Sequence, residues 1–246
     1  MRTLPGIESV HGGLAPPWRT LILTSVALTL YFVAGPAPEA WVYDRPAIAA
    51  GELWRLVTGH LVHADASHAL WNIAALVLLG TLFEGRLGRW LTASLSAGVL
   101  AIDLWLWWGM PALTHYCGLS GLLNTLLAAG LCALWREYRD PVVLLVAAGA
   151  VAKIAFEGLS GQAVFTDVVW PSVPSVHGVG FATGLILAAL RCKTPARASP
   201  MTAPLPWSEE FCRWIGTRHL GGYPKHLCKP HPASSRHPLR LDLPPR

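Results

Sequence analysis

A serine between glycines is the first feature of the sequence with an evident chemical use. Ser120 lies in the tetrapeptide Gly-Leu-Ser-Gly, with Gly118 two residues before it and Gly121 directly after it. Glycines let the backbone turn sharply and let a second chain approach closely. A serine at the beginning of a helix is commonly only a cap for that helix. Taken alone, Ser120 therefore favours a cap over a nucleophile.

A histidine begins a second glycine-containing segment later in the chain. His177, Gly180 and Gly184 are separated by three and four residues, so they share one face of a predicted helix. Small residues on a face allow a neighbouring helix to pack closely. Such an approach would bring the imidazole toward a side chain of another helix, although packing alone also explains the spacing.

A third polar set precedes and begins an earlier apolar segment. His60 and His63 are followed by His68 and Asn72, and the last two are four residues apart, one above the other on one helix face. Strongly polar groups inside apolar segments are costly and are functional candidates by default. The alternative interpretation of this pair is a polar link between helices.

These three sets become specific when they are taken together. A hydroxyl nucleophile, an imidazole base and further donors for an oxyanion are the parts of serine-based acyl transfer. With the membrane topology that the connecting charges favour, all of them fall in the outer third of their predicted helices, and packing residues would rarely reach one depth by chance. We therefore predict Ser120 as the nucleophile and His177 as its base.

The elements that must position these residues are membrane-spanning helices. Of the 246 residues, 53% are hydrophobic and 13% are charged, whereas a soluble domain carries about 25% charged residues. Spanning a bilayer takes about 20 apolar residues in a helix. Six segments qualify or nearly qualify: 18–35, 67–83, 90–110, 120–135, 141–158 and 176–190. The sequence predicts an all-α membrane protein with a bundle of six transmembrane helices.

The charges of the connections predict the orientation in the membrane. Arginine or lysine follows the second, fourth and sixth segments, whereas 111–118 and 159–175 contain neither. The positive-inside rule then places both termini in the cytoplasm. The loop 36–66 faces the outside, and its many aromatic and aliphatic residues lead us to expect that it lies in the membrane interface.

The composition changes abruptly at the end of the last segment. Residues 191–246 hold ten Lys or Arg against three Asp or Glu, and they contain half of the twenty prolines. Such a segment cannot bury enough apolar surface to offset its ordering entropy. We expect a cytoplasmic N-terminus over 1–17, a helical domain over 18–192 and a disordered basic tail over 193–246. Because the excess basic charge is confined to the tail, no nucleic-acid groove is expected in the body.

Neither a metal nor another cofactor is expected. The five cysteines are odd in number and unevenly spaced, so they do not predict a disulfide framework. A group of cysteines and histidines in the tail could in principle bind zinc, but their spacings match no familiar zinc finger. These residues are Cys212, His219, His226, Cys228 and His231.

Three charged residues, Asp103, Lys153 and Glu157, lie away from the ends or in the second half of their apolar segments. Lys153 and Glu157 are four apart, and we interpret them as pairing with each other or with a loop. The simplest such arrangement is a Lys153–Glu157 ion pair whose charged groups extend out of the membrane at the outer end of the helix. Asp103, in the third segment, has no evident partner.

The order of these motifs resembles that of the rhomboid intramembrane proteases. The shared pattern is H-x4-H-x3-N on one helix, G-x-S-G on a later one and H-x2-G-x3-G on the last. The resemblance covers roughly residues 52–190 and includes Trp54-Arg55 ahead of His63 in the first loop. It implies a six-helix rhomboid-like bundle with a long first loop, embedded in a lipid bilayer, that cleaves membrane-anchored proteins.

The resemblance also implies roles for individual residues. Ser120 and His177 would form a dyad without an acidic third member. The oxyanion hole would consist of the Ser120 backbone N–H with the side chains of His68 and Asn72. His63 would support water access or the first loop, and the glycines named above would support the site.

Within the family, several sequence blocks look closer to the rhombosortases, a bacterial branch thought to trim proteins with a Gly-Gly C-terminal sorting tail. These blocks are ELWRLVTGHLVH, YCGLSGLL and AKIAFEGLSG. They imply a bacterial inner membrane protein with its site toward the periplasmic face. Many rhomboids have a tyrosine four residues after the nucleophile, where this chain has Asn124. We expect the Asn124 amide to hydrogen-bond His177 in place of the stacking tyrosine.

Two other classes of function remain as alternatives. A rhomboid-like protein that binds membrane segments without cutting them usually lacks the serine or the histidine, and both are present here. A small transporter would have repeated halves and charges at the midplane. No internal repeat is visible, and Asp103 is the only candidate for an unpaired charge at that depth.

Overall fold

The computed structural model describes residues 16–161, 164, 170 and 173–193. The chain divides into two units, Met1–Pro195 and Ala196–Arg246, and every described residue lies in the first. Apart from residue 193, the predicted tail lies outside the described residues, and so does most of the predicted N-terminal segment.

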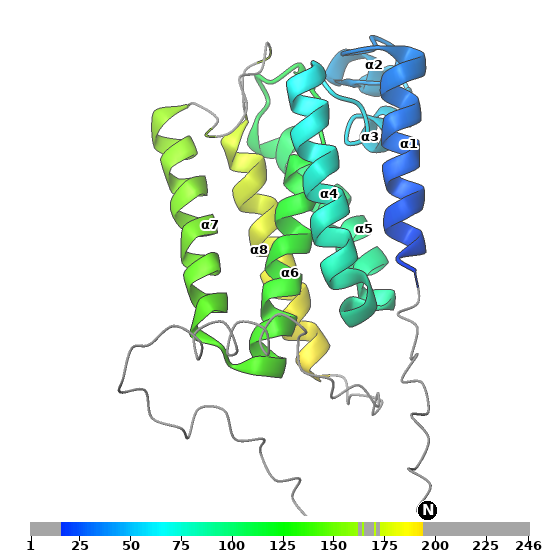
Figure 1. Cartoon of the computed structure of the whole chain (residues 1–246). Helices are drawn as coiled ribbons and strands as arrows, with labels where there is room; N and C mark the ends of the chain where they lie inside the picture. The colour runs from blue at the N-terminus through cyan, green and yellow to red at the C-terminus, as the bar shows by residue number, and fades with distance from the viewer. Residues whose placement is uncertain (1–15, 162–163, 165–169, 171–172, 194–246) are drawn as a thin grey trace, which may run out of the picture. The chain divides into compact units, whose positions relative to one another are not determined.

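Helices make up most of the described chain (Figure 1). The six that have sixteen or more residues are α1 (Trp18–Ala34), α4 (Ala66–Leu87), α5 (Arg89–Leu104), α6 (Ser120–Tyr138), α7 (Pro141–Ser160) and α8 (Pro174–Lys193). α5 continues into a π-helical turn, η1 (Trp105–Gly109). The first loop contains β1 (Tyr43–Asp44), α2 (Arg45–Ala49) and α3 (Arg55–Thr58), and β2 (His115–Tyr116) precedes α6. Each predicted apolar segment coincides with one long helix, within a few residues at its ends.

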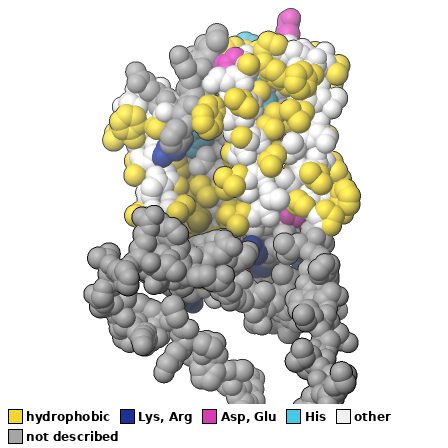
Figure 2. All heavy atoms as spheres, viewed as in Figure 1, with side chains coloured by type: hydrophobic (Ala, Val, Ile, Leu, Met, Phe, Trp, Pro, Cys, Tyr) yellow, Lys and Arg dark blue, Asp and Glu magenta, His cyan; other side chains and the backbone are white. Residues whose placement is uncertain are grey.

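Among the residues that the structure describes, three helical segments are long and apolar enough to cross a membrane. They are Ala66–Leu87, Arg89–Gly109 and Pro141–Ser160, and α1 is a shorter apolar helix. α7 is little covered by the rest of the protein, with 11% of its most apolar window buried. Apolar side chains are spread over the visible face of the helical body (Figure 2). These features suit helices that face lipid, whereas the count of six spans stays a prediction.

α6 and α8 pack against each other more closely than ordinary side chains would allow. A Cβ atom built on Gly180 would lie 2.1 Å from the Gly121 carbonyl oxygen, and one built on Gly184 would lie 2.3 Å from the Thr125 carbonyl oxygen. Backbone therefore lies against backbone along this face. The two helices that carry the predicted nucleophile and base thus have a fixed separation.

Side-chain carboxylates stabilise the beginnings of α4 and α1. The Asp65 carboxylate accepts from the His68 backbone N–H at 2.8 Å and caps α4. α1 has no side-chain cap of its own. Glu84 of α4 instead accepts from the backbone N–H groups of Arg19 and Thr20, both at 2.9 Å. An acidic group at a helix N-terminus satisfies free N–H groups and complements the helix dipole.

The first loop is fastened to the segment before α6. β1 pairs with β2 in antiparallel register, and the Gly118 N–H donates to the Gly59 carbonyl oxygen at 2.9 Å. Arg55 is buried and binds the Glu52 carboxylate at 2.7 Å and the Val42 carbonyl oxygen at 3.0 Å. These bonds fix the loop directly beside the beginning of α6.

Candidate active site

The two residues predicted to perform the chemistry are in contact. The Ser120 Oγ atom lies 2.9 Å from His177 Nε2, which is a hydrogen-bond distance. Ser120 is the first residue of α6, and the cap position before it belongs to Leu119, which makes no side-chain cap bond. The Ser120 hydroxyl is therefore directed at an imidazole and does not cap its own helix, so the simpler interpretation of this serine as a helix cap is wrong.

The turn before Ser120 requires the glycine at position 118. Gly118 has a φ of +120°, a backbone conformation that side-chain-bearing residues rarely adopt, and a Cβ there would lie 2.5 Å from His68 Cε1. The Tyr116 hydroxyl donates to the Gly118 carbonyl oxygen at 2.9 Å. Both backbone groups of Gly118 are thus bonded, and the ring of His68 lies against it.

The glycine after Ser120 makes room for α8. A Cβ on Gly121 would lie 2.5 Å from Val176 Cγ1 and 2.6 Å from Ile102 Cδ1. Val176 is fully buried and directly precedes His177. A side chain at position 121 would therefore displace the first turn of α8, which holds the imidazole.

The residues predicted to form the oxyanion hole are His68 and Asn72 of α4 and Ser120 of α6, and of these the His68 ring lies against Gly118. The Ala64 N–H points at His68 Nδ1 at 3.4 Å, and an imidazole that accepts at Nδ1 carries its proton at Nε2. The Asn72 amide donates to the His68 carbonyl oxygen at 3.0 Å and has a second N–H. The Ser120 N–H, at the first position of a helix, has no acceptor within that helix. The oxyanion role of these groups stays a prediction.

The side chain of His63 is buried next to the ring of His68. It is 0% exposed, and its ring lies edge-on to the His68 ring with 5.2 Å between centroids. Burial, followed by the nearby His68 ring, lowers the pKa of His63 to about 3, and the Asp65 carboxylate opposes this. The His63 carbonyl oxygen accepts from the Ala37 N–H at 2.8 Å. This neutral ring and its backbone bond fit a supporting role for the first loop.

Glu157 is the largest departure from the sequence-based interpretation. The carboxylate pairs with Lys153 Nζ at 2.6 Å, as expected, but it is 1% exposed and so is buried inside the protein. Its second oxygen, Oε2, lies 2.9 Å from His177 Nδ1. The expectation of a Ser–His pair with no acidic neighbour is therefore wrong for the geometry, because α7 ends beside the beginning of α8. The available sequence signal was a carboxyl group in an apolar helix, near the end that meets the beginning of α6 and Ser120.

The predicted contact between Asn124 and His177 is not present in the described part of the chain. The Asn124 amide donates instead to the Ser120 carbonyl oxygen, one turn earlier in α6, at 2.8 Å. A short amide side chain four residues later in a helix reaches that carbonyl without leaving its own helix.

Asp103 has a partner that the sequence did not reveal. Its carboxylate lies 3.2 Å from His60 Nε2, and both side chains are buried. The His60 ring also lies edge-on to Tyr116, with 5.6 Å between centroids. Asp103 therefore pairs with the first loop and is not an isolated charge.

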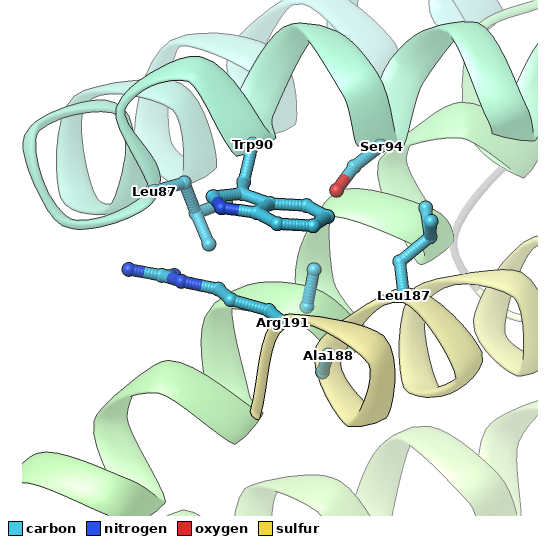
Figure 3. A pocket seen from close by; sticks show the side chains of 7 residues that line it. Leu87, Trp90, Ser94, Leu187, Ala188 and Arg191 are labelled. Atoms are coloured by element: carbon cyan, nitrogen blue, oxygen red, sulfur yellow. The ribbon is translucent and has the colours of Figure 1, made fainter. Parts of the chain in front are cut away.

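A small pocket lies at the opposite end of the bundle from Ser120, lined by residues of α4, α5, α6 and α8 (Figure 3). The labelled lining residues are Leu87, Trp90, Ser94, Leu187, Ala188 and Arg191. Its lining includes a serine but no histidine, so it lacks a base for that hydroxyl. Among the residues that the structure describes, no group of three His, Cys, Asp or Glu side chains is arranged to hold a metal ion. The tail cysteines and histidines lie outside those residues.

Comparison with protein families gives one match. The Rhomboid domain matches residues 50–194, more than half of the chain, and this range includes every site residue discussed above. A comparison with curated proteins found no match.

Proposed function

This chain belongs to the rhomboid family, and we propose on that premise that it is an intramembrane serine endopeptidase. Members of the family are generally serine proteases that act on membrane proteins within the bilayer. The protein is accordingly an integral membrane protein. The single observation that best supports catalysis by this chain is the 2.9 Å contact between Ser120 Oγ and His177 Nε2.

Acylation follows from that contact. Ser120 Oγ forms a bond to the scissile carbonyl carbon while its proton moves to His177 Nε2. The carbonyl oxygen becomes an oxyanion, which the Ser120 N–H and the donors of His68 and Asn72 stabilise. The carbon–nitrogen bond then breaks, and the proton on Nε2 passes to the leaving amine.

Deacylation repeats these steps with water. A water molecule gives a proton to His177 Nε2 as its oxygen bonds to the acyl carbon. The bond to Ser120 Oγ then breaks, and the proton returns from Nε2 to that oxygen. The free enzyme and a carboxylic acid product result, so the pair is unchanged over one cycle.

The substrates we propose are membrane-anchored proteins with a Gly-rich cleavage site, of the Gly-Gly sorting-tail class. A substrate helix must unwind to present a carbonyl to Ser120, and glycine lowers the cost of unwinding. The beginnings of α4, α6 and α8 lie at one end of the bundle (Figure 1). A site at this end would meet the margin of a transmembrane segment rather than its middle.

The orientation we propose is the one that the charges favour. Both termini would be cytoplasmic and the site would face the periplasm of a bacterial inner membrane. Arg86 and Arg89 flank the junction of α4 and α5, and Arg136 and Arg139 flank that of α6 and α7. All four lie at the helix ends opposite to Ser120, in keeping with the positive-inside rule.

Replacement of the nucleophile tests this function. Ser120→Ala is expected to abolish both cleavage of a Gly-rich transmembrane substrate and labelling by a fluorophosphonate, which reacts with activated serines. Insertion and thermal midpoint should stay close to those of the wild type, because the Ser120 hydroxyl caps no helix and a helix cap is worth only about 1–2 kcal/mol in any case.

Ser67→Ala is the matched control, since Ser67 also lies in the first turn of a helix at this end of the bundle. It should label and cleave normally. Labelling of Ser120→Ala at the wild-type rate would refute the nucleophile assignment. A wild-type protein that binds the substrate but neither cleaves nor labels would favour the non-catalytic binding protein.

A further inference from the structure

Three side chains from α6, α7 and α8 are joined by two consecutive contacts. His177 occupies the middle, with Nε2 2.9 Å from Ser120 Oγ and Nδ1 2.9 Å from Glu157 Oε2. A neutral imidazole carries one proton on its two nitrogens, so the hydrogen bond at Nδ1 decides whether Nε2 can accept a proton. If the Nδ1–H group donates a hydrogen bond to the carboxylate, Nε2 has a lone pair that can accept the Ser120 proton.

We infer that Glu157 is a positioning residue, which holds His177 in the tautomer and orientation that the proposed reaction needs. The inference rests on the proposed function. Glu157 neither touches the substrate nor gains a proton, and it acts only through the imidazole. When Nε2 receives the Ser120 proton, the ring becomes a cation and the adjacent carboxylate stabilises it.

The Glu157 carboxylate is itself held in place. Oε1 accepts from Lys153 Nζ at 2.6 Å and from the Val164 backbone N–H at 3.0 Å. This leaves Oε2 for His177. Two donors on Oε1 hold the carboxylate in one orientation, which is required of a group that orients a base.

A purely structural role is the competing explanation. Glu157 connects α7 to α8 and to Val164, so its loss could lower activity simply by loosening the end of α7. The same carboxylate could also serve only to neutralise Lys153. Neither explanation involves the tautomer of His177, and this difference makes the two roles separable.

Replacing the Glu157 carboxylate by an amide is expected to move the His177 ring proton from Nδ1 to Nε2. In Glu157→Gln the amide N–H₂ can donate to Nδ1, which keeps the ring proton on Nε2, pointing at the Ser120 hydroxyl. Nε2 then cannot accept the Ser120 proton. For the corresponding change in a soluble serine protease, kcat falls about 10⁴-fold. We expect a fall in kcat of at least about 10³-fold with little change in KM, because the substrate does not contact Glu157.

Two further variants separate positioning from structure. Glu157→Asp keeps the charge and shortens the side chain by one methylene, so it should recover part of the lost kcat. Lys153→Met combined with Glu157→Gln removes the ion pair as a neutral unit. If Glu157 only neutralises Lys153, the double variant regains the wild-type rate. If Glu157 positions His177, the double variant is as slow as Glu157→Gln alone.

The experiment uses the full chain in detergent. It measures kcat and KM for a Gly-rich transmembrane substrate, the rate of fluorophosphonate labelling, and the thermal midpoint of each variant. A wild-type kcat in Glu157→Gln, or recovery in the double variant, overturns the inference. If Glu157→Gln does not insert, the double and Asp variants decide by the same criteria.

Failure of the proposed function gives a different pattern. In that case the wild type does not cleave or label, or Ser120→Ala labels as the wild type does. Failure of the present inference alone leaves the wild type active, Ser120→Ala inactive and Glu157→Gln as fast as the wild type.

Discussion

Replacement of Gly180 by alanine is expected to separate the nucleophile from its base without touching either. An added Cβ would lie 2.1 Å from the Gly121 carbonyl oxygen and 3.1 Å from Thr125 Oγ1. The clash with the Gly121 carbonyl oxygen is with a backbone atom, so no side-chain rotation can relieve it. To restore an ordinary contact, α8 must move away from α6 by about 1 Å, a displacement that is large on the scale of catalytic geometry.

The expected magnitudes follow from that displacement. The distance from Ser120 Oγ to His177 Nε2 would increase from 2.9 Å to a value beyond hydrogen-bond range. A misplacement of about 1 Å can cost about 100-fold in rate. Overpacking costs about 1–3 kcal/mol of stability, and alanine in a helix recovers about 1 kcal/mol relative to glycine. Activity should therefore fall much further than stability.

Gly178→Ala is the matched control in the same helix. The nearest atom to a Cβ at position 178 is Ile154 Cγ2 at 3.7 Å, an ordinary van der Waals contact. This variant gains the same helix propensity without the clash, so it should be at least as stable as the wild type and equally active.

The assay compares both variants by substrate cleavage, fluorophosphonate labelling and thermal midpoint in the same detergent. Wild-type cleavage by Gly180→Ala would refute the reasoning, because it would mean that the separation of α6 and α8 does not control the Ser120–His177 contact. Equal losses in both variants would refute it as well.

Two further predictions concern the first loop and the tail. Burial lowers the pKa of His63 to about 3, so below pH about 6.5 the unfolded chain binds a proton that the folded chain does not. The free energy of unfolding should therefore be highest above pH about 6.5 and should fall by up to about 1.4 kcal/mol per pH unit below it. Thermal midpoints at pH 7 and pH 5 should therefore differ less for His63→Gln than for the wild type, and an identical pH dependence would contradict this. Truncation after Lys193 should leave cleavage in detergent unchanged, since the composition of 194–246 offers no apolar face to dock on the bundle. A truncated protein that inserts but is inactive would contradict this prediction. Tight zinc binding by the tail in the full chain would also contradict it.

The positions of the long helices could be read from the sequence. Each apolar segment is long enough to form a helix by itself and ends near glycine, proline or charged residues, so its location depends on local composition. The spacing of His177, Gly180 and Gly184 likewise placed them on one face, because helical periodicity is a local property. Local sequence patterns are therefore sufficient to nominate Ser120 and His177 as partners.

The tertiary structure alone decided which polar groups meet between helices. Glu157 paired with Lys153 in its own helix, as the spacing predicts, but its contact with His177 depends on how α7 lies beside α8. Asp103 likewise meets His60 only because the first loop returns to α5. Asn124 shows the converse, since its amide remains within α6. Spacing along one helix determines which residues share a face. Contacts between helices depend instead on the rotation and separation of whole helices. For α6 and α8, this separation is set at glycines that pack against residues far away in the sequence.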